Sequence, residues 1–302
     1  MRIRYALFSL LVLFAAGSVA KADEVFDPKA VYIYQGQEPS ASTMVAGSWG
    51  SGTVTVNKDK KTIFTGPSSI KVVSQTYHSG LRLDFPNGVP LFSNDEHNGK
   101  YLILTMFFPD THIVNPAAGT AMQNDTEPYR VPKASNVRLI LESATGVRVL
   151  LTQPTVPLDP DDNWIRLPVP LSKLKISGVG SDFVLKRLIV TTESETTFYL
   201  GQMKLVQDNS PILVEFLPSQ IVAVADWVFF QSRAQVGVAS VKYTWDFGDG
   251  SKPRTDMGRI GFHQFAQGGD FKVKLTVEDV DGIKTPVTVE TTITVIDVWD
   301  GT

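Results

Sequence analysis

Residues able to perform nucleophilic or acid–base chemistry are few and scattered in this chain. Its 302 residues include no cysteine and only four histidines, His78, His97, His112 and His263. None of the four stands in a recognised catalytic or metal-binding motif. The densest polar cluster, Asp95-Glu96-His97, precedes Asn98-Gly99 and predicts a solvated turn. We therefore expect a non-catalytic protein, although the paired carboxylates of a polysaccharide hydrolase or lyase could still meet in space.

The N-terminal sequence and the net charge indicate where the protein acts and which partners are not expected. Arg2 and Arg4 precede an apolar run, Ala6–Ala16, and a small-residue stretch ending at Ala22, the pattern of a secretory signal peptide over residues 1–22. The alternative is a membrane anchor, but the run is shorter than the ~20 residues that span a bilayer. The mature chain is expected to be secreted, periplasmic or at the cell surface, without a transmembrane segment. A net charge of −3 makes nucleic acid an unexpected partner.

Strand patterns dominate the rest of the chain. Short stretches rich in Val, Ile, Thr, Phe and Tyr are separated by Gly, Pro, Asn and Asp, and no helix longer than two turns is predicted. A polar stretch that ends in proline, residues 207–211, predicts a domain boundary. We therefore expect an all-β protein with one domain over residues 23–207 and a second over residues 208–302.

The second domain contains a specific motif, Trp245-Asp246-Phe247-Gly248-Asp249-Gly250, followed by His263-Gln264-Phe265 and Gly269-Asp270-Phe271. Together these sequences resemble the PKD (polycystic kidney disease) domain family. The resemblance implies an immunoglobulin-like β-sandwich with Trp245 in its core, acting as a spacer or as a module that contacts proteins or polysaccharides. Asp246 and Asp249 could bind a metal or form an acid–base pair, but their spacing around two glycines favours closure of the turn.

The first domain contains three strand motifs, Thr65–Val72, Asn163–Ser172 and Phe198–Leu205. Together they resemble the galactose-binding-like jelly rolls found among carbohydrate-binding modules. The resemblance implies a jelly-roll β-sandwich. That family usually carries two acids where this chain has Gly201-Gln202, and one of those acids commonly binds a structural calcium. No cofactor is therefore expected, and Asp27 and Glu38 remain the candidate metal ligands.

Sugars are bound by flat aromatic side chains that stack on the ring and by planar polar groups that bond its hydroxyls. The first domain offers five such residues: Trp49, Tyr77, His78, Arg82 and Tyr129. Trp49 stands among the glycines and serines of residues 47–52. Its side chain either contacts a ligand or packs on the rim of the sandwich, and the sequence favours neither. Tyr77 and His78 precede a strand, and ordinary edge positions are the alternative for them.

Three functions remain open for this chain. The leading hypothesis is an exported, non-catalytic protein that binds polysaccharide or glycan through the first domain. The second domain would then be a spacer or interaction module. The alternative is a structural or assembly protein of the cell surface in contact with envelope proteins. The third hypothesis, a hydrolase or lyase on a jelly-roll scaffold, requires several acids and a histidine or tyrosine to converge in one groove.

Overall fold

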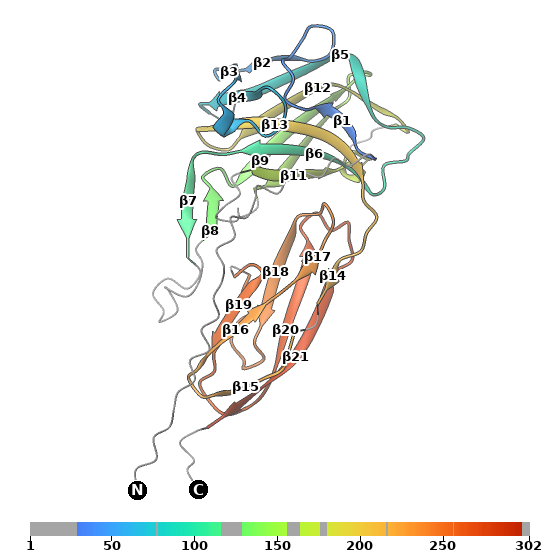
Figure 1. Ribbon diagram of the computed structural model, residues 1–302. Coiled ribbons are helices and arrows are strands. Elements are labelled where there is room, and N and C mark those ends of the chain that lie inside the picture. The colour runs from blue at the N-terminus through green and yellow to red at the C-terminus, as the bar shows by residue number, and fades with distance from the viewer. Residues whose placement is uncertain are drawn as a thin grey trace, which may run out of the picture.

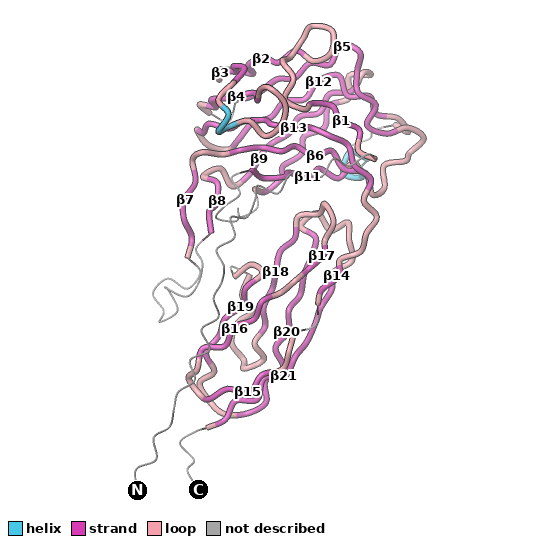
Figure 2. The backbone as a smooth tube through the Cα atoms, in the orientation of Figure 1, coloured by secondary structure: helices cyan, strands magenta, loops and turns pink. Residues whose placement is uncertain are grey.

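The computed structural model describes residues 29–76, 78–115, 129–155, 164–175, 180–215, 217–255 and 257–297. Nearly all regular structure in these residues is β-strand, and its two helical segments are the short η1 (Lys60–Thr62) and α1 (Ser172–Lys175) (Figures 1 and 2). The predicted all-β fold is confirmed. Among the described residues, no helix has the length and apolar character needed to cross a membrane.

The first sandwich consists of two sheets that pack face to face (Figure 1). One sheet has the order β11-β6-β13-β4-β3, with β1 also paired to β13, and the other has the order β10-β9-β12-β5-β2. The strands of the first sheet are β1 (Val31–Tyr34), β3 (Thr53–Asn57), β4 (Ser69–Ser74), β6 (Lys100–Phe107), β11 (Trp164–Pro170) and β13 (Thr196–Gln207). Those of the second are β2 (Val45–Trp49), β5 (Gly80–Phe92), β9 (Asn136–Ser143), β10 (Arg148–Pro154) and β12 (Phe183–Thr192).

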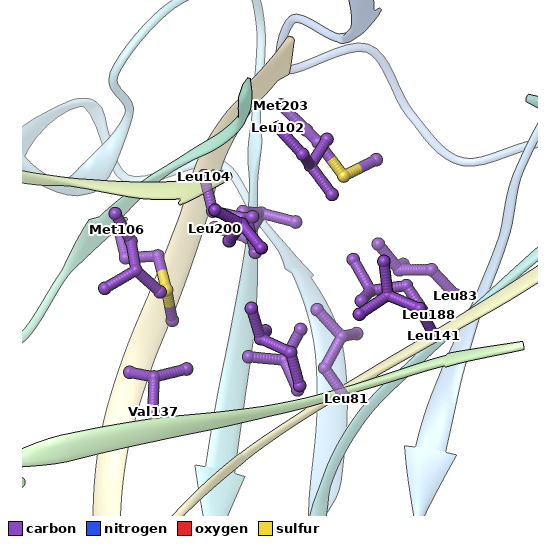
Figure 3. Packing of buried hydrophobic residues seen from close by; sticks show 14 of the residues in the cluster. Leu81, Leu83, Leu102, Leu104, Met106, Val137, Leu141, Leu188, Leu200 and Met203 are labelled. Carbon is purple, nitrogen blue, oxygen red and sulfur yellow. The ribbon is translucent and has the colours of Figure 1, made fainter. Parts of the chain in front are cut away.

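Alternation along the strands supplies the core between these sheets. Leu81 and Leu83 on β5 point inward, as do Leu102 and Leu104 on β6, and all four are fully buried (Figure 3). Because successive side chains of a strand point to opposite faces, the residues between them point outward. The apolar period of two thus decides which residues of β2, β5, β9, β10 and β12 face away from the core.

The second sandwich begins after residue 207 and has its own core. Its main sheet has the order β15-β21-β20-β18, in which β15 runs parallel to β21, and smaller sheets pair β16 with β19 and β14 with β17. The strands are β14 (Leu213–Val214), β15 (Gln220–Ala223), β16 (Trp227–Gln231), β17 (Ala234–Gln235), β18 (Val241–Asp246), β19 (Ile260–Gln264), β20 (Gly269–Asp279) and β21 (Val287–Ile296).

Trp245 lies at the centre of this second core, as the resemblance implied. Its side chain is completely buried, and the indole Nε1 donates a hydrogen bond to the carbonyl of Gly258 at 2.9 Å. A Cβ at Gly261 of β19 would lie 2.6 Å from the ring, so only glycine permits this close contact. The tryptophan therefore satisfies its polar group while filling the space between the two sheets.

Three local expectations need correction. Trp49 ends strand β2, although the glycines and serines of residues 47–52 are typical of a loop. The turn-like sequence Pro86-Asn87-Gly88 lies within β5, because three extra residues of β5 bulge out between its pairings with Arg187 and Leu185 of β12. Trp164 is buried, but it packs on Phe64 and Phe107 on the outer side of its sheet and not in the core between the sheets.

Candidate functional site

The candidate site lies on the outer side of the five-stranded sheet. The register places Trp49 opposite Gly80, and Gly47 opposite Arg82. Since Leu81 points into the core, Trp49 and Arg82 both point outward from neighbouring strands. We call the outward-facing residues of β2, β5, β12, β9 and β10, with the adjoining His78, the Trp49 face. The pairing of β2 with β5 thus brings together two candidates that are 33 positions apart in the sequence.

A tight turn places His78 beside Trp49. Ser79 Oγ accepts hydrogen bonds from the backbone amides of Gln75 (2.6 Å) and Thr76 (2.8 Å), which folds the chain back just before β5. The rings of Trp49 and His78 meet edge to face, with centroids 6.2 Å apart and planes at 62°. The imidazole is exposed and the indole is half-buried, so the pair offers an aromatic surface of fixed orientation.

The Arg82 guanidinium extends across the neighbouring strand. A Cβ built on Gly47 would lie 3.3 Å from Arg82 Nη2, so the glycine leaves room for the arginine head group. Arg82 Nε lies 2.9 Å from an oxygen of Asp84 on the same strand. This close ion pair lies on the same face as the two aromatic rings, although Arg82 Nε is buried and forms no hydrogen bond with the described residues.

An ion-pair ladder continues from Arg82 across the sheet. Asp84 lies 2.6 Å from Arg187 Nε on β12, and Arg187 Nη1 lies 3.6 Å from Glu142 on β9. Glu142 in turn lies 2.9 Å from Arg148 Nε on β10. The hydrogen bond that Arg187 donates to Asp84 is the main cause of the raised pKa of Arg187. The sequence analysis missed this ladder, although the spacing of Arg82 and Asp84 on one strand face was a signal for it.

Two other predicted ligand residues are not brought to this face. Tyr77 lies outside the described residues. Tyr129 opens β8 (Tyr129–Pro132), which pairs with β7 (Thr111–Val114) in a separate two-stranded sheet. In Figure 1 this hairpin projects away from the sandwich, whereas β2 lies at its opposite end. The backbone therefore gives no support for grouping Tyr129 with Trp49.

Only one of the two candidate metal ligands lies in the described part of the chain. Asp27 lies outside the described residues, and Glu38 forms an exposed ion pair with Lys58 at 2.5 Å. Within the described part of the chain, no three His, Asp or Glu side chains gather as metal ligands would. Glycine is required at position 201, because a Cβ there would lie 2.5 Å from the Trp164 ring and 2.4 Å from Phe64.

The acids of the second sandwich hold turns, as expected, but one also has a histidine partner that the sequence analysis did not find. Asp246 accepts from the Gly248 amide, and Asp249 accepts from the amide and hydroxyl of Ser251. Asp249 also lies 2.7 Å from His263 Nε2. Burial alone would raise the pKa of Asp249, but the hydrogen bonds from Ser251 and His263 outweigh it and lower the pKa to about 2.

The imidazole of His263 is fixed by aromatic packing as well as by this bond. It stacks on Phe247 with ring centroids 4.1 Å apart and meets Phe265 edge to face. The ring is therefore a structural part of the β18–β19 packing. We assign the Asp249–His263 pair to the stability of the turn.

The two sandwiches are joined by buried polar contacts. Lys284, in the turn between β20 and β21, donates from Nζ to Asp208 (2.7 Å), Ser210 (3.3 Å) and the Val236 carbonyl (2.8 Å). The Asp208 amide donates to the carbonyl of Gly99 in the first sandwich at 2.7 Å. Burial opposes the ionised form of Asp208, but its bonds from Lys284, Ser210 and Val238 lower the pKa to about 2.

A second set of contacts completes this joint. Asp281, in the same turn as Lys284, accepts from Lys173 of α1 and lies 3.5 Å from the Gln153 amide of β10. Tyr101, Ile103 and Val206 of the first sandwich form a small apolar cluster against which Val238 of the second packs. The joint therefore combines an apolar contact with the Lys173–Asp281 pair, and the Lys284–Asp208 pair holds the boundary segment beside it.

Comparison with protein families agrees with the second sandwich. Residues 208–295 match the family model of the PKD domain, which confirms the resemblance drawn from the motif around Trp245. Such domains typically occur in extracellular proteins, and they point to an adhesion or spacer module. A comparison with curated proteins finds no match. The carbohydrate-binding-module resemblance of the first sandwich stays a prediction.

Proposed function

We propose that this protein is an exported, non-catalytic binding protein that recognises a polysaccharide or glycan on the Trp49 face. The PKD domain would serve as its spacer or adhesion module. The observation that supports the proposal is the gathering of Trp49, His78 and Arg82 on one outer sheet face. An aromatic ring for stacking beside a planar set of donors is the combination that a sugar ring and its hydroxyls require.

A glycan array and polysaccharide pull-down test this proposal, with the intact protein and Trp49→Ala. Wild type should bind members of the panel, and Trp49→Ala should weaken binding at least tenfold because the stacking surface is lost. Phe229→Ala is the matched control, since it removes a partly exposed aromatic from the PKD domain. Failure of the wild type to bind across broad panels would overturn the proposal. Release of reducing ends from a bound polysaccharide would refute the non-catalytic role.

One observation favours a second candidate, a structural or assembly role at the cell surface. Ile221 of β15 and Ile296 of β21 lie outward at one edge of the PKD domain, 73% and 50% exposed. Exposed apolar side chains next to an edge strand are typical of protein contact sites. Sedimentation analysis tests this role, since Ile221→Lys should abolish any self-association of the wild type. A wild type that stays monomeric and captures no envelope protein would exclude it.

A further inference from the structure

The Trp49 face has an excess of arginine. By strand register its outward positions include Arg82 on β5, Arg187 on β12, Arg138 on β9 and Arg148 on β10. The carboxylates on the same side are Asp84, Glu142 and Glu193, which directly follows β12. Four arginines and three carboxylates thus lie on the same side of this sheet, whereas the whole chain has a net charge of −3. The face is more positive than the protein as a whole.

The three carboxylates are already engaged by the protein. Asp84 lies between Arg82 and Arg187, and Glu142 lies between Arg187 and Arg148. Glu193 accepts from the Ser135 amide and the Asn136 side chain, and the bond from Asn136 is the main cause of its lowered pKa. Asp84 and Glu142 are therefore paired with arginines, whereas Glu193 is held by two uncharged donors.

Two of the arginines keep free hydrogen-bond donors. Arg82 and Arg148 each contact a carboxylate through Nε, and among the described residues nothing accepts from their terminal Nη groups. Their side chains are 42% and 68% exposed. The two Nη groups of a guanidinium form a planar fork that matches a carboxylate or sulfate.

The two forks lie on different strands. Arg82 and Arg148 are separated by β12 and β9, so the spacing of neighbouring strands puts them roughly 14 Å apart. This separation exceeds the size of one sugar residue. A ligand that uses both arginines must run across the strands as a chain with repeated charges.

From this arrangement we infer that the ligand of the Trp49 face is an anionic polysaccharide whose carboxylate or sulfate groups bind Arg82 and Arg148. The inference rests on the proposed glycan-binding function and specifies its ligand class. Trp49 and His78 stack on a sugar ring at one end of the face, and the arginines select for charge. Because the arginines are largely exposed, affinity should fall as salt is raised.

Isothermal titration with the intact protein tests this inference with polygalacturonate and its fully methyl-esterified form, which share a sugar backbone and differ in charge. Dextran sulfate and dextran form a second pair that separates sulfate from carboxylate recognition. Arg82→Gln and Arg148→Gln remove one fork each, and circular dichroism verifies their folding. Arg166→Gln is the matched control, because Arg166 is an exposed arginine on β11 of the other sheet.

We expect the anionic member of at least one pair to bind at least tenfold more tightly than its neutral partner. Arg82→Gln and Arg148→Gln should each reduce that affinity at least fivefold, with Arg166→Gln unchanged, and galacturonate monomer should bind far more weakly than the polymer. Equal binding of charged and neutral polymers, with a loss on Trp49→Ala, would overturn the inference and leave the proposed function standing. No binding of any polysaccharide would overturn both.

Discussion

Lys284 provides a direct test of the buried ion pair that holds the boundary residue Asp208. Its ammonium group donates three hydrogen bonds, and its side chain is only 6% exposed, while that of Asp208 is 11% exposed. Lys284→Met keeps much of the side-chain volume but leaves Asp208 charged and without its counter-ion. Removing one partner of a buried ion pair costs about 3–5 kcal/mol. We expect the lower end, because Asp208 keeps its bonds from Ser210 and Val238.

Urea unfolding followed by tryptophan fluorescence and circular dichroism measures this cost. Asp208→Asn combined with Lys284→Met removes both charges and should restore part of the lost stability, so that a double-mutant cycle isolates the pair. Lys272→Met is the control, because its exposed ion pair with Glu290 should contribute no more than about 1 kcal/mol. A loss below about 1 kcal/mol for Lys284→Met would refute the description of Lys284 and Asp208 as a buried ion pair.

Three further results are expected from the remaining buried groups. The pKa of Asp249 lies at about 2, below its ordinary value of 3.8, so the stability that this carboxylate contributes is present above pH 4 and is lost as pH falls towards 2. Acid unfolding should show this loss of stability, and His263→Gln should make the loss smaller. Burial, and to a smaller extent the charges of nearby aspartates, raises the pKa of Tyr101 to about 12. The stability that the neutral phenol contributes is therefore present below pH 10 and is lost between pH 10 and 12. In alkaline unfolding, the stability of Tyr101→Phe should fall less steeply with pH than that of wild type. Gly201→Ala should lower the free energy of unfolding by about 1–3 kcal/mol through overlap with Trp164, as measured in urea.

Each of these expectations has a contradicting outcome. An identical acid-unfolding curve for wild type and His263→Gln would show that the histidine does not hold the Asp249 carboxylate in its charged form. Tyr101→Phe with an unchanged pH slope above 10 would place that phenol in contact with water. Gly201→Ala with wild-type stability would mean that Phe64 and Trp164 are free to move apart.

The sequence predicted the features that depend on local patterns. The alternation around Trp245 and the glycines after it identified a buried strand and its turn, because both are set by neighbouring residues. The position of Trp49 next to Arg82 could not be read in this way. It depends on the pairing of β2 with β5, which a shift of one residue would reverse. The Asp249–His263 bond likewise depends on how β18 and β19 pack.

The buried pair of Asp208 and Lys284 could not be predicted from the sequence, for a different reason. Asp208 and Lys284 are 76 residues apart, and each stands in a polar stretch that predicts a solvated turn. Charged residues of this kind are usually exposed, so nothing local indicates burial. Their burial depends on the β20–β21 turn folding onto the boundary segment, where Lys284 also meets Ser210 and the Val236 carbonyl.

The joint and the Trp49 face lie on different parts of the first sandwich. The apolar contact of the joint uses Tyr101 of β6 and Val206 of β13, which belong to the six-stranded sheet, whereas Trp49 and Arg82 belong to the five-stranded sheet. Asp281 also contacts Gln153 of β10 in the five-stranded sheet, but Gln153 pairs with the buried Val137 and so lies on the core side of that sheet, away from the Trp49 face. Because Asp281 and Lys284 are held by the first sandwich and the boundary residue Asp208, the spacer also orients that face. A polysaccharide bound there would meet a surface whose direction relative to the PKD domain is set by the joint.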